Sequence, residues 1–287
     1  MSKNTAKTKK TISNVLVHVF LTILAVIWIF PILWVIMLSF REGTGSYTTT
    51  FIPEQFTINN YVRLFTETDL FNFPRWFMNT FIVACFSCVI STFFVLSVAY
   101  CMSRLRFKVR KTFMNVALIL GMFPGFMSMI AVYYILKGMG MAEGPLKMVA
   151  LVLVYSAASG LGFYVVKGFF DTIPKAIDES AYLDGASKFQ VFTKITIPLS
   201  KPVIVQTIIQ AFLAPWLDFI FAKVIVGTQP KYFTVAIGLW TMLTKENITN
   251  WYTRFACGAV CVSIPIAILF CMMQKYYTQG SSGAVKG

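Results

Sequence analysis

The sequence predicts an all-α, polytopic membrane protein with six transmembrane helices. Of its 287 residues, 57% are hydrophobic and only 13% are charged, whereas a soluble domain carries about a quarter charged residues. Several apolar runs are long enough to cross a bilayer, which takes about 20 helical residues. These runs lack the alternation of period 2 that marks the strands of a membrane barrel. We therefore expect a bundle of helices within a lipid bilayer.

Six apolar runs divide the chain. We expect spans at about residues 15–38, 78–102, 113–136, 148–170, 203–226 and 255–277. Residues 1–14 and 278–287 are then short tails, and residues 171–202 form a polar segment between the fourth and fifth spans. The first run is too long for the hydrophobic region of a signal peptide, and no A-x-A site follows it, so we expect an uncleaved first span.

Proline and glycine interrupt two of the spans. Pro31 is expected to kink the first, and Gly121, Pro124 and Gly125 are expected to weaken the backbone ladder of the third. Such interruptions are tolerated where neighbouring helices or a water-filled cavity satisfy the freed backbone groups. Pro124 is therefore a candidate residue of a solute path. In the fourth span, the small residues between Ser156 and Gly162 allow close helix approach.

The basic residues set the expected orientation. The formal net charge is +14, but no basic and aromatic residues interleave outside the apolar runs, so we expect no nucleic-acid partner. With both termini in the cytoplasm, the inner segments hold more Lys and Arg than the outer loops, as the positive-inside rule requires. The loop from Ser103 to Lys111 holds five of them, and we interpret it as a patch for anionic lipid headgroups. This orientation places residues 171–202 in the cytoplasm.

The polar segment from Asp171 to Pro202 is the most informative stretch. Pro174 suits the first turn of a helix, and good helix formers follow it as far as Leu183. Asp184-Gly185 indicates a turn, and residues 186–194 are expected to form a second helix. The segment is therefore expected to be a helix–turn–helix with an apolar side and an acidic cluster of Asp178, Glu179 and Asp184.

The spacing within this segment resembles the EAA loop of ABC importer permeases. Three elements of that pattern are present: Glu179-Ser180-Ala181, then Asp184-Gly185-Ala186, then eight residues to Ile195 and Pro198. Ser180 and Ile197 replace Ala and Leu of the family pattern. The resemblance implies a type I ABC importer permease fold whose cytoplasmic coupling helix docks on a separate ATPase, through Glu179, Ser180, Ala181, Asp184, Gly185 and Ala186. The alternative is an ordinary cytoplasmic helical hairpin.

Further motifs resemble those of carbohydrate permeases, in particular the smaller permease subunit of maltose/maltodextrin systems. They are Asn79-Thr80 at the start of the second span, residues 231–239 of the outer loop, and the end of the chain from Gln274 to Gly287. In that group, residues equivalent to 231–239 reach toward a sugar-binding protein and the tail reaches the ATPase.

Asp218 is the one acidic residue well inside an expected span. An ionisable group within the membrane indicates a functional site by default. Residues 216–219 also resemble the W-N-D/E-F of carbohydrate permeases, with Leu217 in place of Asn. Carboxylates accept hydrogen bonds from sugar hydroxyls and aromatic rings cover sugar faces, so Trp216 and Asp218 are candidate residues of the path. The alternative is that Asp218 braces a break at Pro215 or pairs with a partner subunit.

The sequence offers no catalytic constellation. It contains no Walker A loop, and its one histidine argues against a nucleophilic triad. The six cysteines fall in or beside apolar runs, so we expect neither a metal site nor a disulfide framework. We therefore expect a chain that is not an enzyme and holds no cofactor, while a partner binds and hydrolyses ATP.

The expected function is that of a permease subunit in an importer of oligosaccharides, most like maltose or maltodextrin, in a bacterial cell membrane. Its expected partners are a homologous permease, an ABC ATPase dimer, an extracytoplasmic sugar-binding protein, the sugar and the lipid bilayer. Alternatives are a permease for another sugar, polyol or small solute, or a self-sufficient secondary carrier. A carrier usually needs several ionisable groups within the membrane, whereas this chain has Asp218 nearly alone.

Overall fold

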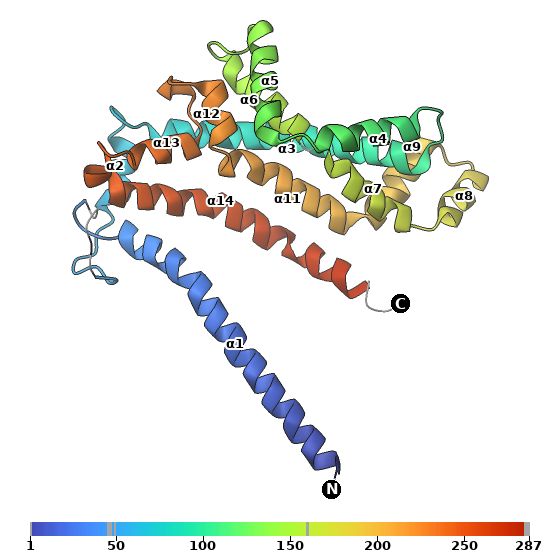
Figure 1. The fold of residues 1–287 in the computed structure, drawn as a ribbon, viewed down its shortest axis with the longest axis horizontal. Helices are drawn as coiled ribbons and strands as arrows, with labels where there is room; N and C mark the ends of the chain where they lie inside the picture. Colours follow the sequence, from blue (N-terminus) through green and yellow to red (C-terminus); the bar gives the residue numbers. More distant parts are fainter. Residues whose placement is uncertain (1, 45–47, 49, 159–160, 284–287) are drawn as a thin grey trace. The chain divides into compact units, whose positions relative to one another are not determined.

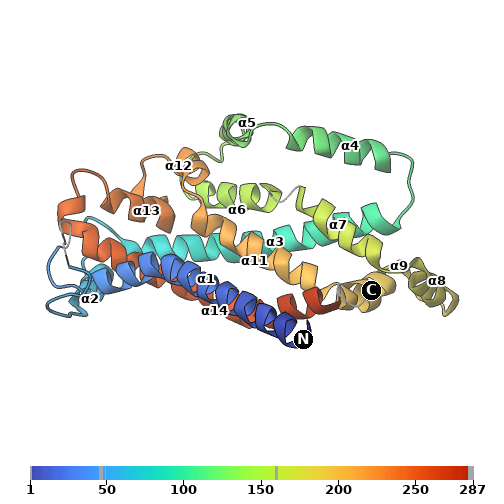
Figure 2. The same ribbon diagram turned by 60° about the horizontal axis from the view of Figure 1, so that its bottom comes forward.

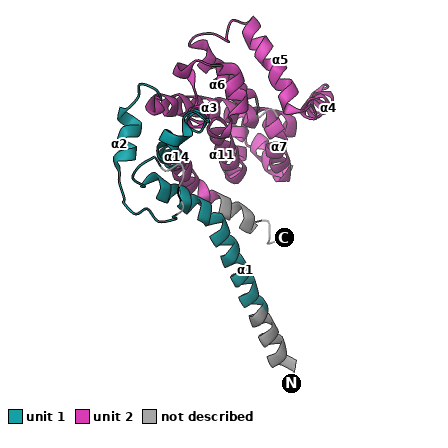
Figure 3. Cartoon of the chain, turned by 60° about the vertical axis from the view of Figure 1, so that its left-hand side comes forward, with its two compact units in different colours: residues 1–70, 241–261 teal, residues 71–240, 262–287 magenta. Residues whose placement is uncertain are grey.

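The computed structural model describes residues 2–44, 48, 50–158 and 161–283. Most of these residues lie in helices joined by loops, and an isolated antiparallel β-bridge pairs Arg41 with Phe56 (Figure 1). The chain divides into two compact units (Figure 3). Unit 1 comprises residues 1–70 and 241–261, and unit 2 comprises residues 71–240 and 262–287.

Unit 1 contains α1 (Ser2–Ser39), α2 (Asn59–Thr66) and the first part of α14 (Ile248–Gly283). Pro31 lies inside α1, which continues through it as one helix. The end of α1 is held by a side-chain cap: the Asn60 amide donates to the carbonyl oxygens of Ser39 at 3.2 Å and Arg41 at 2.7 Å. These bonds satisfy carbonyl groups that a helix end leaves without a partner.

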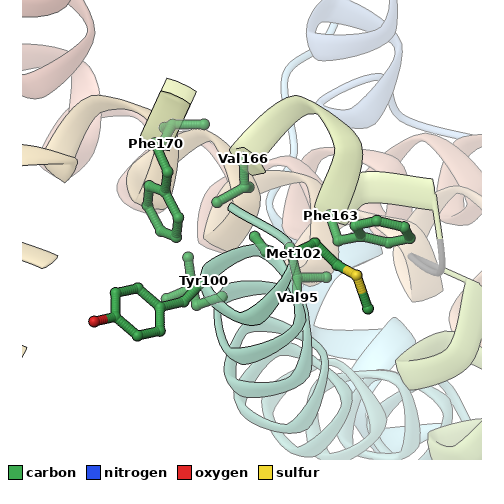
Figure 4. Close-up of a cluster of buried hydrophobic side chains, with 9 residues drawn as sticks. Val95, Tyr100, Met102, Phe163, Val166 and Phe170 are labelled. Carbon is green, nitrogen blue, oxygen red and sulfur yellow. The ribbon is translucent and has the colours of Figure 1, made fainter. Parts of the chain in front are cut away.

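Unit 2 is organised around the long helix α3 (Phe73–Arg104), which packs against α6 (Leu146–Ala158), α7 (Gly162–Thr172) and α11 (Lys201–Leu217). A buried apolar cluster joins α3, α7 and α11 near one end of α3 (Figure 4). It includes Val95, Tyr100, Met102, Phe163, Val166 and Phe170.

Shorter helices complete unit 2. They are α4 (Arg110–Gly121), α5 (Gly125–Gly138), α8 (Lys175–Leu183), α9 (Lys188–Val191), α10 (Ile197–Leu199), α12 (Ile220–Val226) and α13 (Val235–Met242), which ends just beyond the unit. In two views α8 and α9 lie at one end of α3, and α12 lies toward the other (Figures 1 and 2).

Four described helices are long and apolar enough to span a membrane, and the number reaches six if each of two bent pairs counts as one span. In one pair, α4 and α5 meet at 103°. This is the predicted interruption at Gly121, Pro124 and Gly125. In the other pair, residues 188–199 and α11 meet at 84°.

The expected fifth span, 203–226, is not continuous, because α11 ends at Leu217 and α12 begins at Ile220. In the fourth span, the predicted close approach at Ser159 and Gly160 lies outside the described residues.

Candidate coupling surface and solute path

The polar segment folds as two short helices around a glycine turn. Pro174 immediately precedes α8, and its missing N–H costs nothing at a helix start. Gly185 follows the helix with φ +82°, a left-handed conformation that favours glycine. The Ala186 N–H donates to the carbonyl oxygen of Ala181 at 2.9 Å, which closes the turn. The predicted helix–turn–helix is confirmed in outline.

The second helix starts later than expected. Ser187 and Gln190 form a reciprocal capping box, so α9 begins at Lys188 and not at Ala186. Such a box satisfies backbone N–H groups that a helix start leaves unpaired. A π-helical turn over Phe192–Thr196 then leads into α10. The capping box could have been found in the sequence, because a serine stands three residues before a glutamine.

The three acidic residues of the predicted cluster separate into buried and exposed groups. Asp178 is buried, whereas Glu179 and Asp184 are exposed. The Asp178 carboxylate lies 3.1 Å from Nε of Arg104, at the end of α3. The two side chains are 7% and 2% exposed, so this is a buried ion pair. Glu179 remains available to a partner.

Arg104 also joins α8 to the end of α7. Its Nη2 donates to the carbonyl oxygens of Phe170 and Ile173, each at 2.9 Å. The planar guanidinium has five donors in a fixed fork, so one side chain can fix three segments at once. The assignment of Arg104 to a lipid-headgroup patch was wrong for this residue, whereas Arg106, in the same loop, is exposed.

The last turn of α3 makes three further contacts with the segment. The Ser103 hydroxyl donates to Asp171 at 2.6 Å, and the Tyr100 hydroxyl donates to the carbonyl oxygen of Lys188 at 3.1 Å. The Tyr100 ring also packs on Phe192, with 4.7 Å between ring centroids. The segment is therefore fastened to α3 both before and after its turn.

The outer surface of the segment carries exposed apolar side chains. Leu183 is 90% exposed and stands four residues after the exposed Glu179, on the same side of α8, and Phe189, beyond the turn, is 73% exposed. Ser180 donates to the carbonyl oxygen of Ala176 within α8, and Ala181 is half-buried. An apolar surface beside a carboxylate has the chemistry of a docking helix that enters a groove with a basic group. We call Leu183, Phe189 and Glu179 the docking surface.

Asp218 lies at the break between α11 and α12. Its carboxylate accepts hydrogen bonds from the N–H groups of Phe221 at 3.1 Å and Ala222 at 3.0 Å, and from the Tyr155 hydroxyl at 2.7 Å. The two backbone bonds cap the start of α12, so the contacts support the bracing alternative. A role in contacting solute stays a prediction.

The other candidate residues of the path are in different environments. Trp216 is 3% exposed, and its ring packs against Phe77 at 5.3 Å and Phe212 at 5.9 Å between centroids. Pro124 is exposed at the start of α5. No group of three or more His, Cys, Asp or Glu side chains that could hold a metal ion occurs among the described residues.

Two motifs that are far apart in the sequence meet at the start of α3. The Asn79 amide donates to the carbonyl oxygens of Lys231 at 3.1 Å and Phe233 at 3.0 Å. The Thr80 hydroxyl accepts from the Val235 N–H at 2.8 Å. The Asn79-Thr80 motif therefore holds the loop that carries the 231–239 motif.

Comparison with known proteins identifies the family. Residues 91–279 match the model of the binding-protein-dependent transport system inner membrane component. The chain is 33% identical over 282 residues to the galactooligosaccharides transport system permease protein GanQ of Bacillus subtilis (strain 168), covering 98% of each chain. It is 32% identical over 286 residues to the maltodextrin transport system permease protein MalD of Streptococcus pneumoniae (strain ATCC BAA-255 / R6), covering 99% of each.

A solved structure supports the fold. One chain of a bacterial ABC transporter involved in the import of the acidic polysaccharide alginate aligns with a TM-score of 0.77 at 21% identity, covering 94% of this chain and 98% of that one. The chain thus belongs to the family of binding-protein-dependent transport system inner membrane components, where its relatives are sugar permeases, and it has the type I ABC importer permease fold.

Proposed function

We propose that this chain is a permease subunit of an ATP-driven importer of oligosaccharides, with a maltodextrin-like sugar as the first candidate. The observation that carries the coupling role is the docking surface on a segment that is held by the buried Arg104–Asp178 pair. Leu183 and Phe189 give this segment an exposed apolar surface with Glu179 on the same helix as Leu183, which is the chemistry that a partner's groove would cover.

The proposed complex contains a second, homologous permease, an ABC ATPase dimer and an extracytoplasmic sugar-binding protein. ATP is bound and hydrolysed by the ATPase alone, and this chain holds no cofactor. It lies in a bacterial cell membrane with both termini in the cytoplasm. The proposed coupling residues are Glu179, Ser180, Ala181, Asp184, Gly185 and Ala186.

The geometry supports a mechanical role. When the ATPase dimer closes, its groove moves the docking surface, and α8 moves with it. The buried ion pair transmits that displacement to the end of α3, because a guanidinium bound to three segments resists sliding of any one of them. Motion of α3 then moves α7 and α11, which pack on it. Alternating access follows as rigid-body motion of packed helices.

The names of the relatives support the substrate class more than one particular sugar. They include a galactooligosaccharide and a maltodextrin permease protein. A galactooligosaccharide is therefore the second candidate.

The test is uptake by proteoliposomes that contain the purified complex, with ATP inside and the binding protein outside. We expect labelled maltodextrins or galactooligosaccharides to accumulate only with ATP. Glu179→Gln should abolish sugar-stimulated ATP hydrolysis without changing the amount of inserted permease. Accumulation by this chain without an ATPase would identify a secondary carrier and refute the proposal.

A further inference from the structure

Two glutamines of α11, Gln206 and Gln210, stand one helical turn apart in a stretch that is apolar apart from them and Thr207. Both line a cavity of about 310 Å³ within unit 2, which is bounded by residues of α3, α6, α7 and α11. Gln206 is half-buried and Gln210 is exposed. Residues four apart lie on the same face of a helix, so the two amides present one polar strip to the cavity.

The two hydroxyl groups that line this cavity form hydrogen bonds within the chain, whereas the two glutamine amides form none among the described residues. The Thr207 hydroxyl donates to the carbonyl oxygen of Val203 at 2.8 Å, and the Tyr155 hydroxyl donates to Asp218. Neither glutamine side chain forms a hydrogen bond with the part of the chain that the structure describes. Within a membrane protein, polar groups are tolerated where they line a cavity that admits water. The strip therefore offers hydrogen-bonding groups to water or to a polar solute that enters the cavity.

The lining of the cavity restricts the chemistry of that solute. Apart from the glutamines, Thr207 and Tyr155, the lining consists of valine, alanine and glycine, and none of the lining side chains is charged. An amide both donates and accepts hydrogen bonds, as a sugar hydroxyl does. Apolar surface with a few polar groups is also typical of small-molecule sites, and the volume lies at the lower end of their range.

We propose that Gln206 and Gln210 form a subsite for a neutral oligosaccharide inside the membrane portion of this chain. The inference rests on the proposed function and adds to it a preference for the charge of the transported sugar. The cavity holds no cation to pair with a uronate carboxylate, so the subsite selects uncharged sugars. In this respect it would differ from an importer of an acidic polysaccharide such as alginate.

The test uses the complete complex in proteoliposomes and the double variant Gln206→Met with Gln210→Met, which keeps side-chain length and removes both amides. Gln55→Met is the matched control, since Gln55 is exposed in a loop of unit 1. The probe is the labelled neutral oligosaccharide that wild-type complex imports fastest. We expect maximal uptake to fall about tenfold in the double variant, the loss that two neutral hydrogen bonds would give.

Three further readouts separate a subsite from other roles. In the double variant, the amount of sugar taken up per ATP hydrolysed should fall together with the uptake rate. The affinity of the binding protein itself for sugar should not change. The complex should still elute intact in size-exclusion chromatography. Unchanged uptake in the double variant would overturn the subsite. Dissociation of the two permeases would overturn it too, because the amides would then face the second subunit. A wild-type complex that imports no sugar would instead refute the proposed function.

Discussion

Two buried or half-buried carboxylates near opposite ends of unit 2 are stabilised in different ways. Asp178 pairs with a guanidinium from a helix that is distant in the sequence, at 3.1 Å. Asp218 accepts from one tyrosine hydroxyl and two backbone N–H groups, with no basic side chain among its hydrogen-bond partners in the described residues. The first arrangement fastens a separate segment to a helix end, and the second braces a break within one span.

This difference separates the ion pair of Asp178, which links several helices that must move together, from the contacts of Asp218, which fix a local break in one span. A buried ion pair whose arginine also binds two backbone carbonyls links α3, α7 and α8, which the proposed ATPase must move together. A cap at the start of α12 fixes the direction of the chain after Leu217 but joins only α6, α11 and α12. We therefore expect loss of the ion pair to have the greater consequence.

The largest effect is expected from Arg104→Gln. It leaves the Asp178 carboxylate buried without its counter-charge, and breaking such a pair typically costs about 3–5 kcal/mol. The thermal unfolding midpoint of the purified protein in detergent should fall markedly, and sugar uptake by the complex should be lost. Arg106→Gln is the matched control, because Arg106 is exposed in the same loop. Equal shifts for the two variants would show that the pair contributes nothing beyond general charge.

A smaller effect is expected from Asp218→Ala. It removes three hydrogen bonds, two of which cap α12, and should cost about 2 kcal/mol. Asp218→Asn keeps an acceptor oxygen and should recover more than half of the loss in unfolding midpoint. The two roles of Asp218 are separated by uptake: if the carboxylate contacts sugar, Asp218→Asn will lower uptake while leaving the midpoint near that of the wild type.

The smallest of these effects is expected from Gly185→Ala. A Cβ at this position meets nothing within 4 Å, so the cost is only the backbone strain of φ +82°, about 1 kcal/mol. Gly168 in α7 is the control, because a Cβ there also meets nothing but the backbone is helical. Gly168→Ala should raise the unfolding midpoint slightly. If the unfolding midpoint fell equally in both variants, the positive φ of Gly185 would not be the cause of the loss of stability.

Local signals in the sequence predicted the coupling segment well. Asp184-Gly185 predicted a turn, and the positive φ of Gly185 confirms it. The interruption between α4 and α5 was also predictable, since Gly121, Pro124 and Gly125 weaken a helix through their own backbone properties. Each of these features depends on residues that are close together in the chain.

Features that depend on tertiary contacts could not be predicted in the same way. The acidic cluster looked uniform, and only packing against α3 buries Asp178 while Glu179 stays exposed. Arg104 has no acidic neighbour in its own loop, so its partner could not be found by spacing. The anchoring of the 231–239 loop by Asn79 and Thr80 likewise joins residues whose proximity arises from the fold.

The docking surface is tested most directly by Leu183→Asp. Leu183 is 90% exposed, so the change should leave the permease folded while placing a charge where a partner's apolar groove must fit. The measurement is the amount of ATPase that copurifies with the two permeases, relative to wild type. The account predicts that the ATPase is lost while the permease pair and its unfolding midpoint are retained. Full retention of the ATPase, with sugar uptake at the wild-type rate, would contradict it.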